Sequence, residues 1–94
     1  MKYTKGEREY TFEMDIDYIM DLEAKDKNFS ITDIFKTFEN GRFRFTELNI
    51  LTQFVGAGTY IQFRESGLDL SDLGDIINGC FEELGFISKE DASD

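Results

Sequence analysis

Residues 70–84 read LSDLGDIINGCFEEL and form the clearest helical pattern in the chain. Apolar side chains recur in this stretch every three or four residues, so they share one face of an α-helix. The polar residues, Asp72 among them, are expected on the opposite side. We predict that the rest of the chain folds around this apolar stripe, which consists of Leu70, Leu73, Ile76, Ile77, Cys80, Phe81 and Leu84.

Residues with suitable capping chemistry mark the ends of this helix. Asp69 or Ser71 can accept the free N–H groups of the first turn, and Gly85 can adopt the left-handed conformation that ends a helix. Gly74 and Gly79 each cost about 1 kcal/mol in helix propensity. We therefore expect these two glycines to flank the stripe where neighbouring segments approach closely.

The length and composition favour one small helical domain. Ninety-four residues suffice for one core, and ten Phe and four Tyr supply bulky apolar surface without a single Pro to interrupt helices. We expect a mainly α fold in which a short N-terminal β-hairpin packs on a small bundle of four to five helices. We expect residues 1–87 to form a single compact domain and residues 88–94 to be a disordered acidic tail, because few of the latter are apolar.

The hairpin is expected over residues 2–14. Tyr3 precedes a turn at Lys5-Gly6, after which Tyr10, Phe12 and Met14 alternate with polar residues. One face of such a hairpin is apolar, and two strands alone are marginally stable in water. The hairpin therefore needs the helices as support.

Capping residues also place the other helices. Asp15, Ser30 and Thr46 can each cap a helix, and Phe45 can contact Ile50 as a hydrophobic staple. The helix after Thr46 is apolar on two faces, so it lies in the middle of the bundle or turns one face toward a partner. The expected helices cover about 16–25, 31–40, 47–56, 60–66 and 70–84.

The charge distribution argues against nucleic-acid binding. Twenty acidic and ten basic residues give a net charge of -10, with acidic ends and a weakly basic middle. No dense basic face exists to neutralise phosphates. Arg42 and Arg44 alternate with Phe43 and Phe45 in a way that nucleic-acid strips also show, but solvated edge charges are the favoured interpretation. The acidic surface indicates a basic protein partner or simply solubility.

The residue types needed for catalysis or metal binding are largely missing. The chain has no His and one Cys, which excludes the usual general base, a Cys–His pair and zinc bound by cysteines. Cys80 is expected to be a small buried hydrophobe rather than a reactive thiol. A calcium loop aligned on Gly41 would put Lys36 and Phe38 where oxygen ligands are required. We therefore expect neither an enzyme nor a cofactor or metal site.

The chain lacks the patterns of export and membrane insertion. No apolar run approaches the roughly 18 residues of a membrane span, and no leader pattern opens the sequence. We expect no contact with a membrane and a location in a reducing cytoplasm.

Several patterns together resemble one protein family. They are the short hairpin, a helix closing on Leu22-Glu23, the capped Phe29-Ser30 helix, the Asn40 to Phe43 link, the Thr46 to Phe54 helix and the final amphipathic helix. The combination, from about Gly6 to Phe86, resembles the small tail assembly chaperones of bacteriophages, and within them the branch that contains the tail proteins of gene transfer agents.

The resemblance implies a function in the assembly of a phage or prophage tail. Such chaperones act in the cytoplasm of the host bacterium, where they are thought to keep the hydrophobic tape measure protein soluble until tail tube subunits polymerise around it. Many also occur in a frameshift-extended form. The partners implied here are the tape measure protein and the tail tube protein, and self-association stays open. The hairpin is shorter than the family leads one to expect.

We predict that an exposed apolar strip holds amphipathic helices of the client. Its expected residues are Ile50, Phe54, Tyr60 and Phe63, for which ordinary core packing is the alternative. Two other functions stay open. An acidic inhibitor that imitates DNA would need its acids on one continuous face, and a structural tail component would remain in the finished particle.

Overall fold

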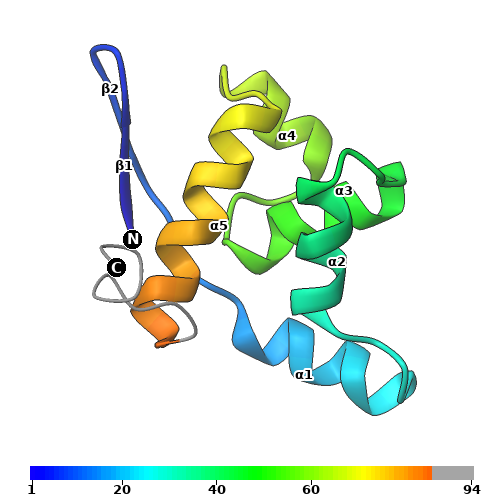
Figure 1. Ribbon diagram of the computed structural model, residues 1–94. Coiled ribbons are helices and arrows are strands. Elements are labelled where there is room, and N and C mark those ends of the chain that lie inside the picture. Colours follow the sequence, from blue (N-terminus) through cyan, green and yellow to red (C-terminus); the bar gives the residue numbers. More distant parts are fainter. Residues whose placement is uncertain (86–94) are drawn as a thin grey trace, which may run out of the picture.

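The computed structural model describes residues 1–85 of the 94, which form a hairpin and five helices (Figure 1). The mainly α fold with an N-terminal hairpin is confirmed, whereas the predicted boundary at residue 87 and the tail 88–94 lie outside the described residues. The elements are β1 (Lys2–Lys5), β2 (Arg8–Thr11), α1 (Ile16–Lys25), α2 (Ile31–Glu39), α3 (Phe45–Phe54), α4 (Tyr60–Glu65) and α5 (Leu70–Leu84).

The hairpin pairs β1 and β2 antiparallel, with Tyr3 opposite Tyr10. Its turn consists of Gly6 and Glu7, one residue later than predicted, because Lys5 still pairs with Arg8. Gly6 has φ +61°, the conformation that the first position of a type II′ hairpin turn requires. The hairpin lies beside α5 (Figure 1).

Helix α5 has the predicted bounds and caps. The Asp69 carboxylate accepts the Asp72 N–H at 3.0 Å, and Gly85 ends the helix with φ +82°. The two internal glycines permit close contact, as predicted. A Cβ on Gly79 would overlap the Met1 side chain, and one on Gly74 would lie 3.6 Å from the Phe38 ring.

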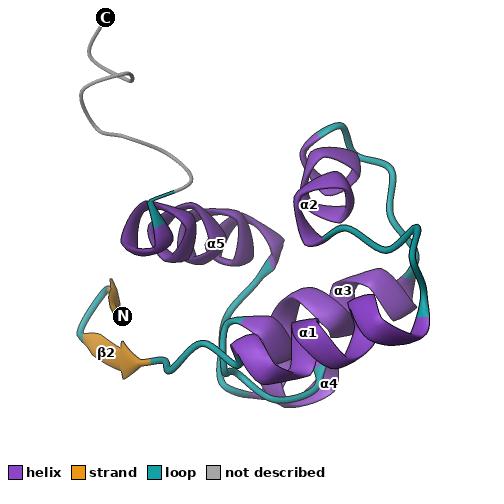
Figure 2. Cartoon of the chain, turned by 90° about the horizontal axis from the view of Figure 1, so that it is seen from below, coloured by secondary structure: helices purple, strands orange, loops and turns teal. Residues whose placement is uncertain are grey.

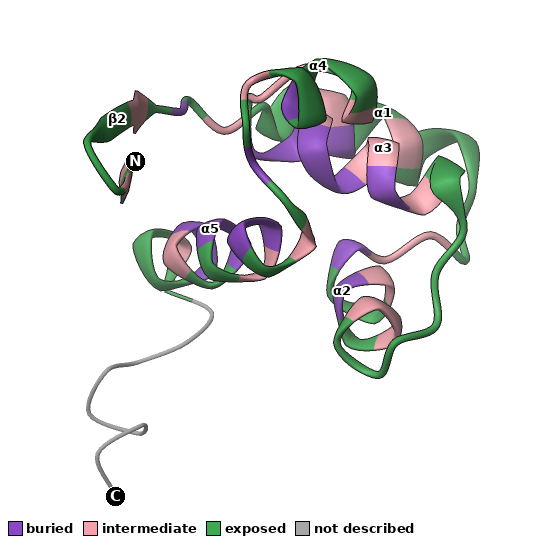
Figure 3. Ribbon diagram, turned by 90° about the horizontal axis from the view of Figure 1, so that it is seen from above, coloured by how far each residue is buried: buried purple, intermediate pink, exposed green. Residues whose placement is uncertain are grey.

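Helix α3 is the centre of the bundle and contacts each of the other four helices. In Figure 1, α4 lies at the top and α1 at the bottom, with α3 between them, and Figure 2, seen from below, shows α2 and α5 beside this stack. The buried residues are concentrated on α3 and α5 (Figure 3). Aromatic rings join these elements: Phe35 meets Phe81 edge to face at 5.2 Å between ring centroids, and Phe54 lies 5.9 Å from Phe81.

The predicted caps of α1 and α2 are confirmed, but that of α3 is wrong. Asp15 accepts the Tyr18 N–H at 3.0 Å, and Ser30 accepts the Asp33 N–H at 3.4 Å. Helix α3 begins at Phe45, before the predicted cap Thr46, because the Glu47 carboxylate accepts the Arg44 N–H at 2.8 Å. The helix therefore spans 45–54 instead of 47–56.

Gly56 lets the segment before α1 cross the end of α3. Its φ is +88°, and a Cβ there would overlap the backbone of Glu13. Beside it the Asp15 N–H donates to the Phe54 carbonyl at 2.8 Å. The connection from the hairpin into α1 is thus held against α3 by backbone contact.

Candidate functional site

Of the four residues predicted as an exposed strip, two lie in the core and two are half-buried. Phe54 and Phe63 are 1% and 0% exposed, so the prediction that they are exposed is wrong. Phe54 packs on Phe81, and the Phe63 ring stacks under Tyr60 with centroids 6.4 Å apart. Ile50 and Tyr60 are half-buried and pack against the core.

Two exposed apolar side chains lie beside Tyr60, one at the start of α3 and one at the start of α4. Phe45 is 77% exposed and Ile61 is 71% exposed, the two largest exposures among the big apolar side chains of residues 1–85. The Phe45 and Tyr60 rings lie 6.2 Å apart between centroids. We call Phe45, Tyr60 and Ile61 the α3/α4 face.

Backbone capping positions this face. Phe45 and Tyr60 are the first residues of α3 and α4, respectively. The Asn49 side-chain carbonyl accepts the Tyr60 N–H at 2.9 Å, which fixes the start of α4 against α3. Thr59 and Gln62 then cap α4 reciprocally, the Gln62 N–H donating to Thr59 at 3.2 Å and the Thr59 N–H to Gln62 at 2.9 Å.

Two further exposed apolar side chains lie on α1. Ile16 is 38% and Met20 is 59% exposed, and they are four residues apart, so they share one side of the helix. Phe43, 38% exposed, rests with its ring 5.6 Å from that of Phe38. It therefore covers the end of α2 instead of forming a free stacking platform.

Asp72 forms the main polar cluster, contrary to the prediction that it faces away from the core. It is 7% exposed and accepts hydrogen bonds from the Tyr3 hydroxyl at 2.6 Å, Lys5 Nζ at 2.7 Å and the Asp69 N–H at 2.8 Å. Local sequence patterns do not predict this cluster, because Lys5 and Tyr3 lie 67 and 69 residues before Asp72. The sequence does indicate that Tyr3 and Lys5 act together, because residues two apart on a strand point to the same side.

The cluster is electrostatically satisfied. Burial raises the pKa of the Asp72 carboxyl, but the hydrogen bonds from Lys5, Tyr3 and the Asp69 N–H outweigh it and lower that pKa to about 2. Burial and then the bond to Asp72 raise the pKa of Tyr3, and the bond to Asp72 raises the pKa of Lys5. Asp72 is therefore ionised and Lys5 protonated at neutral pH, an arrangement that clamps the hairpin to α5 and leaves no free base.

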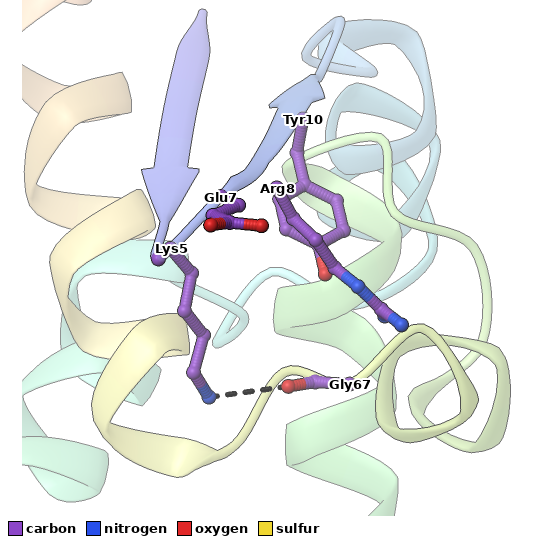
Figure 4. A pocket seen from close by; sticks show the side chains of 6 residues that line it. Lys5, Glu7, Arg8, Tyr10 and Gly67 are labelled. Carbon is purple, nitrogen blue, oxygen red and sulfur yellow. Dashed lines mark hydrogen bonds between the residues drawn. The ribbon is translucent and has the colours of Figure 1, made fainter.

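An open pocket of about 750 Å³ lies at the tip of the hairpin (Figure 4). Its donors are already bonded to the end of α4: Lys5 Nζ donates to the Gly67 carbonyl at 3.1 Å, and Arg8 and the Tyr10 hydroxyl donate to the Ser66 carbonyl at 3.2 and 2.6 Å. These groups attach the hairpin to the α4–α5 connection.

A second open pocket, of about 250 Å³, lies where the α1–α2 loop, α2 and α3 meet and includes Asp26, Asp33 and Glu47. Within residues 1–85, no group of three or more His, Cys, Asp or Glu side chains could hold a metal ion. Cys80 is fully buried, and this burial, followed by the charge of Glu83, raises the pKa of its thiol to about 11.

Comparison with protein-family models, with curated proteins and with solved structures finds no match. No helix in residues 1–85 has the length and apolar character needed to cross a membrane. The α3/α4 face is the candidate site, because it contains the two most exposed large apolar side chains of residues 1–85.

Proposed function

We propose that this chain is a tail assembly chaperone of a phage or prophage, which binds an apolar segment of the tape measure protein in the host cytoplasm and keeps it soluble. The observation that carries the proposal is the α3/α4 face, where Phe45 and Ile61 leave most of their apolar surface in water. Large apolar side chains that stay exposed on a small domain favour a binding surface.

The scaffold supports this kind of surface. The face is built at the starts of α3 and α4, and α3 contacts all the other helices, so the core fixes the backbone from which Phe45 and Tyr60 project. An amphipathic helix of the client can lay its apolar side across these rings. The identity of the client comes from the resemblance to tail assembly chaperones alone.

Co-expression with the tape measure protein tests the proposal. Wild-type chain is expected to keep the client in the soluble fraction and to co-purify with it, whereas a Phe45→Asp and Ile61→Asp double variant is expected to lose both effects. Met20→Asp is the matched control, because Met20 is another exposed apolar residue but lies on α1. Thermal unfolding curves of all variants check that each of them is folded. A double variant that solubilises the client as well as wild type does would overturn the proposal.

The finished particle gives a second test. A chaperone is expected to be missing from purified tails, because it leaves when the tube polymerises. Mass spectrometry that finds the chain there in stoichiometric amounts would identify it as a structural tail component instead.

A further inference from the structure

We propose that the client segment bound at the α3/α4 face is acidic: an amphipathic helix whose apolar side meets this face while neighbouring carboxylates meet Arg42 and Arg44. The inference rests on the proposed function and adds the chemistry of the client. It is the opposite of what the net charge of -10 indicates, since a strongly acidic chain favours basic partners.

The charge around the face differs from that of the rest of the chain. Residues 40–65, which contain α3, α4 and the loop before them, hold three Arg and two Glu, a net charge of +1. All other residues hold seven Lys or Arg and eighteen Asp or Glu, a net charge of -11. The exposed apolar face thus lies in a part of the sequence where the acidic excess disappears; the first ten residues, with three bases and two acids, are another such part.

The two arginines before Phe45 are available to a partner. Arg42 and Arg44 are exposed, and the ion pairs within residues 1–85 involve Met1 and Lys5 instead. By contrast, the third arginine of this region, Arg64, already donates to the Leu68 carbonyl at 3.2 Å. A guanidinium is a donor without an acceptor and binds a carboxylate through two parallel hydrogen bonds.

One of the two acids in this region is already bonded, and the other stays exposed. Glu47 uses its carboxylate on the Arg44 backbone N–H, where it also balances the positive end of the α3 dipole. Glu65 is exposed on α4, four residues after Ile61. The loop before Phe45, from Asn40 to Arg44, contains two bases and no acid.

Two synthetic helical peptides test the charge of the client directly. Each has about 18 residues, or about five turns, with leucine along one side. One carries glutamate beside the leucines, and the other carries lysine. ¹H–¹⁵N NMR spectra follow the backbone amides of Phe45, Tyr60 and Ile61 during each titration. The glutamate peptide is expected to shift these amides at lower concentration, and more strongly at low ionic strength.

A charge-reversal pair separates local from overall electrostatics. Arg42→Glu with Arg44→Glu changes the net charge by four units, as does the control Lys25→Glu with Lys27→Glu at the exposed end of α1. We expect the arginine variant to bind the glutamate peptide roughly tenfold more weakly than wild type, because it loses two exposed charge contacts. The affinity of the lysine variant is expected to fall by less than about twofold.

Three outcomes would overturn the inference. The first is preference of the Phe45 and Ile61 amides for the lysine peptide. The second is equal weakening by both charge-reversed pairs, which would mean that net charge alone acts. The third is a shift of the same amides with protein concentration in the absence of peptide, since a second copy of the chain would then cover the face.

Failure of the inference is distinguishable from failure of the proposed function. If the tape measure protein stays bound to the Arg42→Glu, Arg44→Glu variant but not to the Phe45→Asp, Ile61→Asp variant, the face binds the client without acidic recognition. If it stays bound to both, the face is not the binding site.

Discussion

At the scale of single residues, Asp72 shows how one buried charge joins segments far apart in the sequence. Replacing it by Asn removes the ionic character of its bonds to Lys5 and Tyr3. Because a hydrogen bond to a charged group contributes about 1.5–3 kcal/mol, we expect Asp72→Asn to lower the free energy of unfolding by about 2 kcal/mol at pH 7. Urea denaturation measures the change, and Asp75→Asn, an exposed acid on the same helix, is the control.

The pH dependence of stability provides a separate check. The pKa of Asp72 is lowered in the folded protein from its ordinary 3.8 to about 2. Its contribution is therefore complete above pH 4 and is lost as the pH falls from about 4 toward 2. Wild type is expected to lose its advantage over Asp72→Asn in that window. If the stability difference between wild type and Asp72→Asn stays constant from pH 6 to pH 2, the charge of Asp72 does not stabilise the fold.

Gly56 combines a left-handed backbone with a close backbone contact. Gly56→Ala places a Cβ against Glu13 at a φ of +88°, whereas Gly41→Ala at φ +77° meets nothing within 4 Å. The left-handed conformation alone costs roughly 1–2 kcal/mol for a residue with a Cβ. We expect that cost for Gly41→Ala and, because the Cβ overlaps the Glu13 backbone, about 2 kcal/mol more for Gly56→Ala, measured by thermal unfolding. Equal losses of stability in the two variants would mean that the segment before α1 moves away from the new Cβ at little cost.

At the scale of secondary-structure elements, the start of α3 separates what the sequence predicts from what packing decides. Thr46 has good capping chemistry, yet Glu47 is the residue that accepts the free N–H of Arg44. We expect Glu47→Ala to destabilise the protein by about 1 kcal/mol and Thr46→Ala to stay within about 0.5 kcal/mol of wild type. Chemical denaturation of both variants decides between the two caps, and the reverse order would restore Thr46 as the cap.

The other elements were predictable because their signals are local. Apolar periodicity and the caps at Asp15, Ser30 and Asp69 are properties of neighbouring residues, and they placed α1, α2 and α5 within a residue of their bounds. The exposure of a side chain, by contrast, depends on which distant segments pack over it. Phe54 and Phe45 are equally apolar, but α5 covers Phe54 through Phe81, whereas no described element covers Phe45. The fold could therefore be predicted more fully than the candidate site.

At the scale of the whole molecule, backbone and charge contacts connect the hairpin, α5 and the core. The hairpin is bonded to α5 through Asp72 and to the α4–α5 connection through Lys5, Arg8 and Tyr10. The segment after the hairpin is bonded to the end of α3. These contacts predict that the hairpin and helices unfold together instead of one after another.

Cys80 reports on this cooperativity, because its thiol is fully buried on α5 and burial raises its pKa to about 11. A thiol reagent such as dithionitrobenzoate at pH 8 is expected to react with the folded protein only through unfolding. If unfolding is global, Asp72→Asn lowers the opening free energy by about 2 kcal/mol and speeds labelling roughly 30-fold when opening and closing are fast. Met20→Asp, distant from the hairpin contacts, is expected to change the rate little. Labelling that is insensitive to Asp72→Asn would show that α5 opens on its own and that the hairpin does not stabilise it.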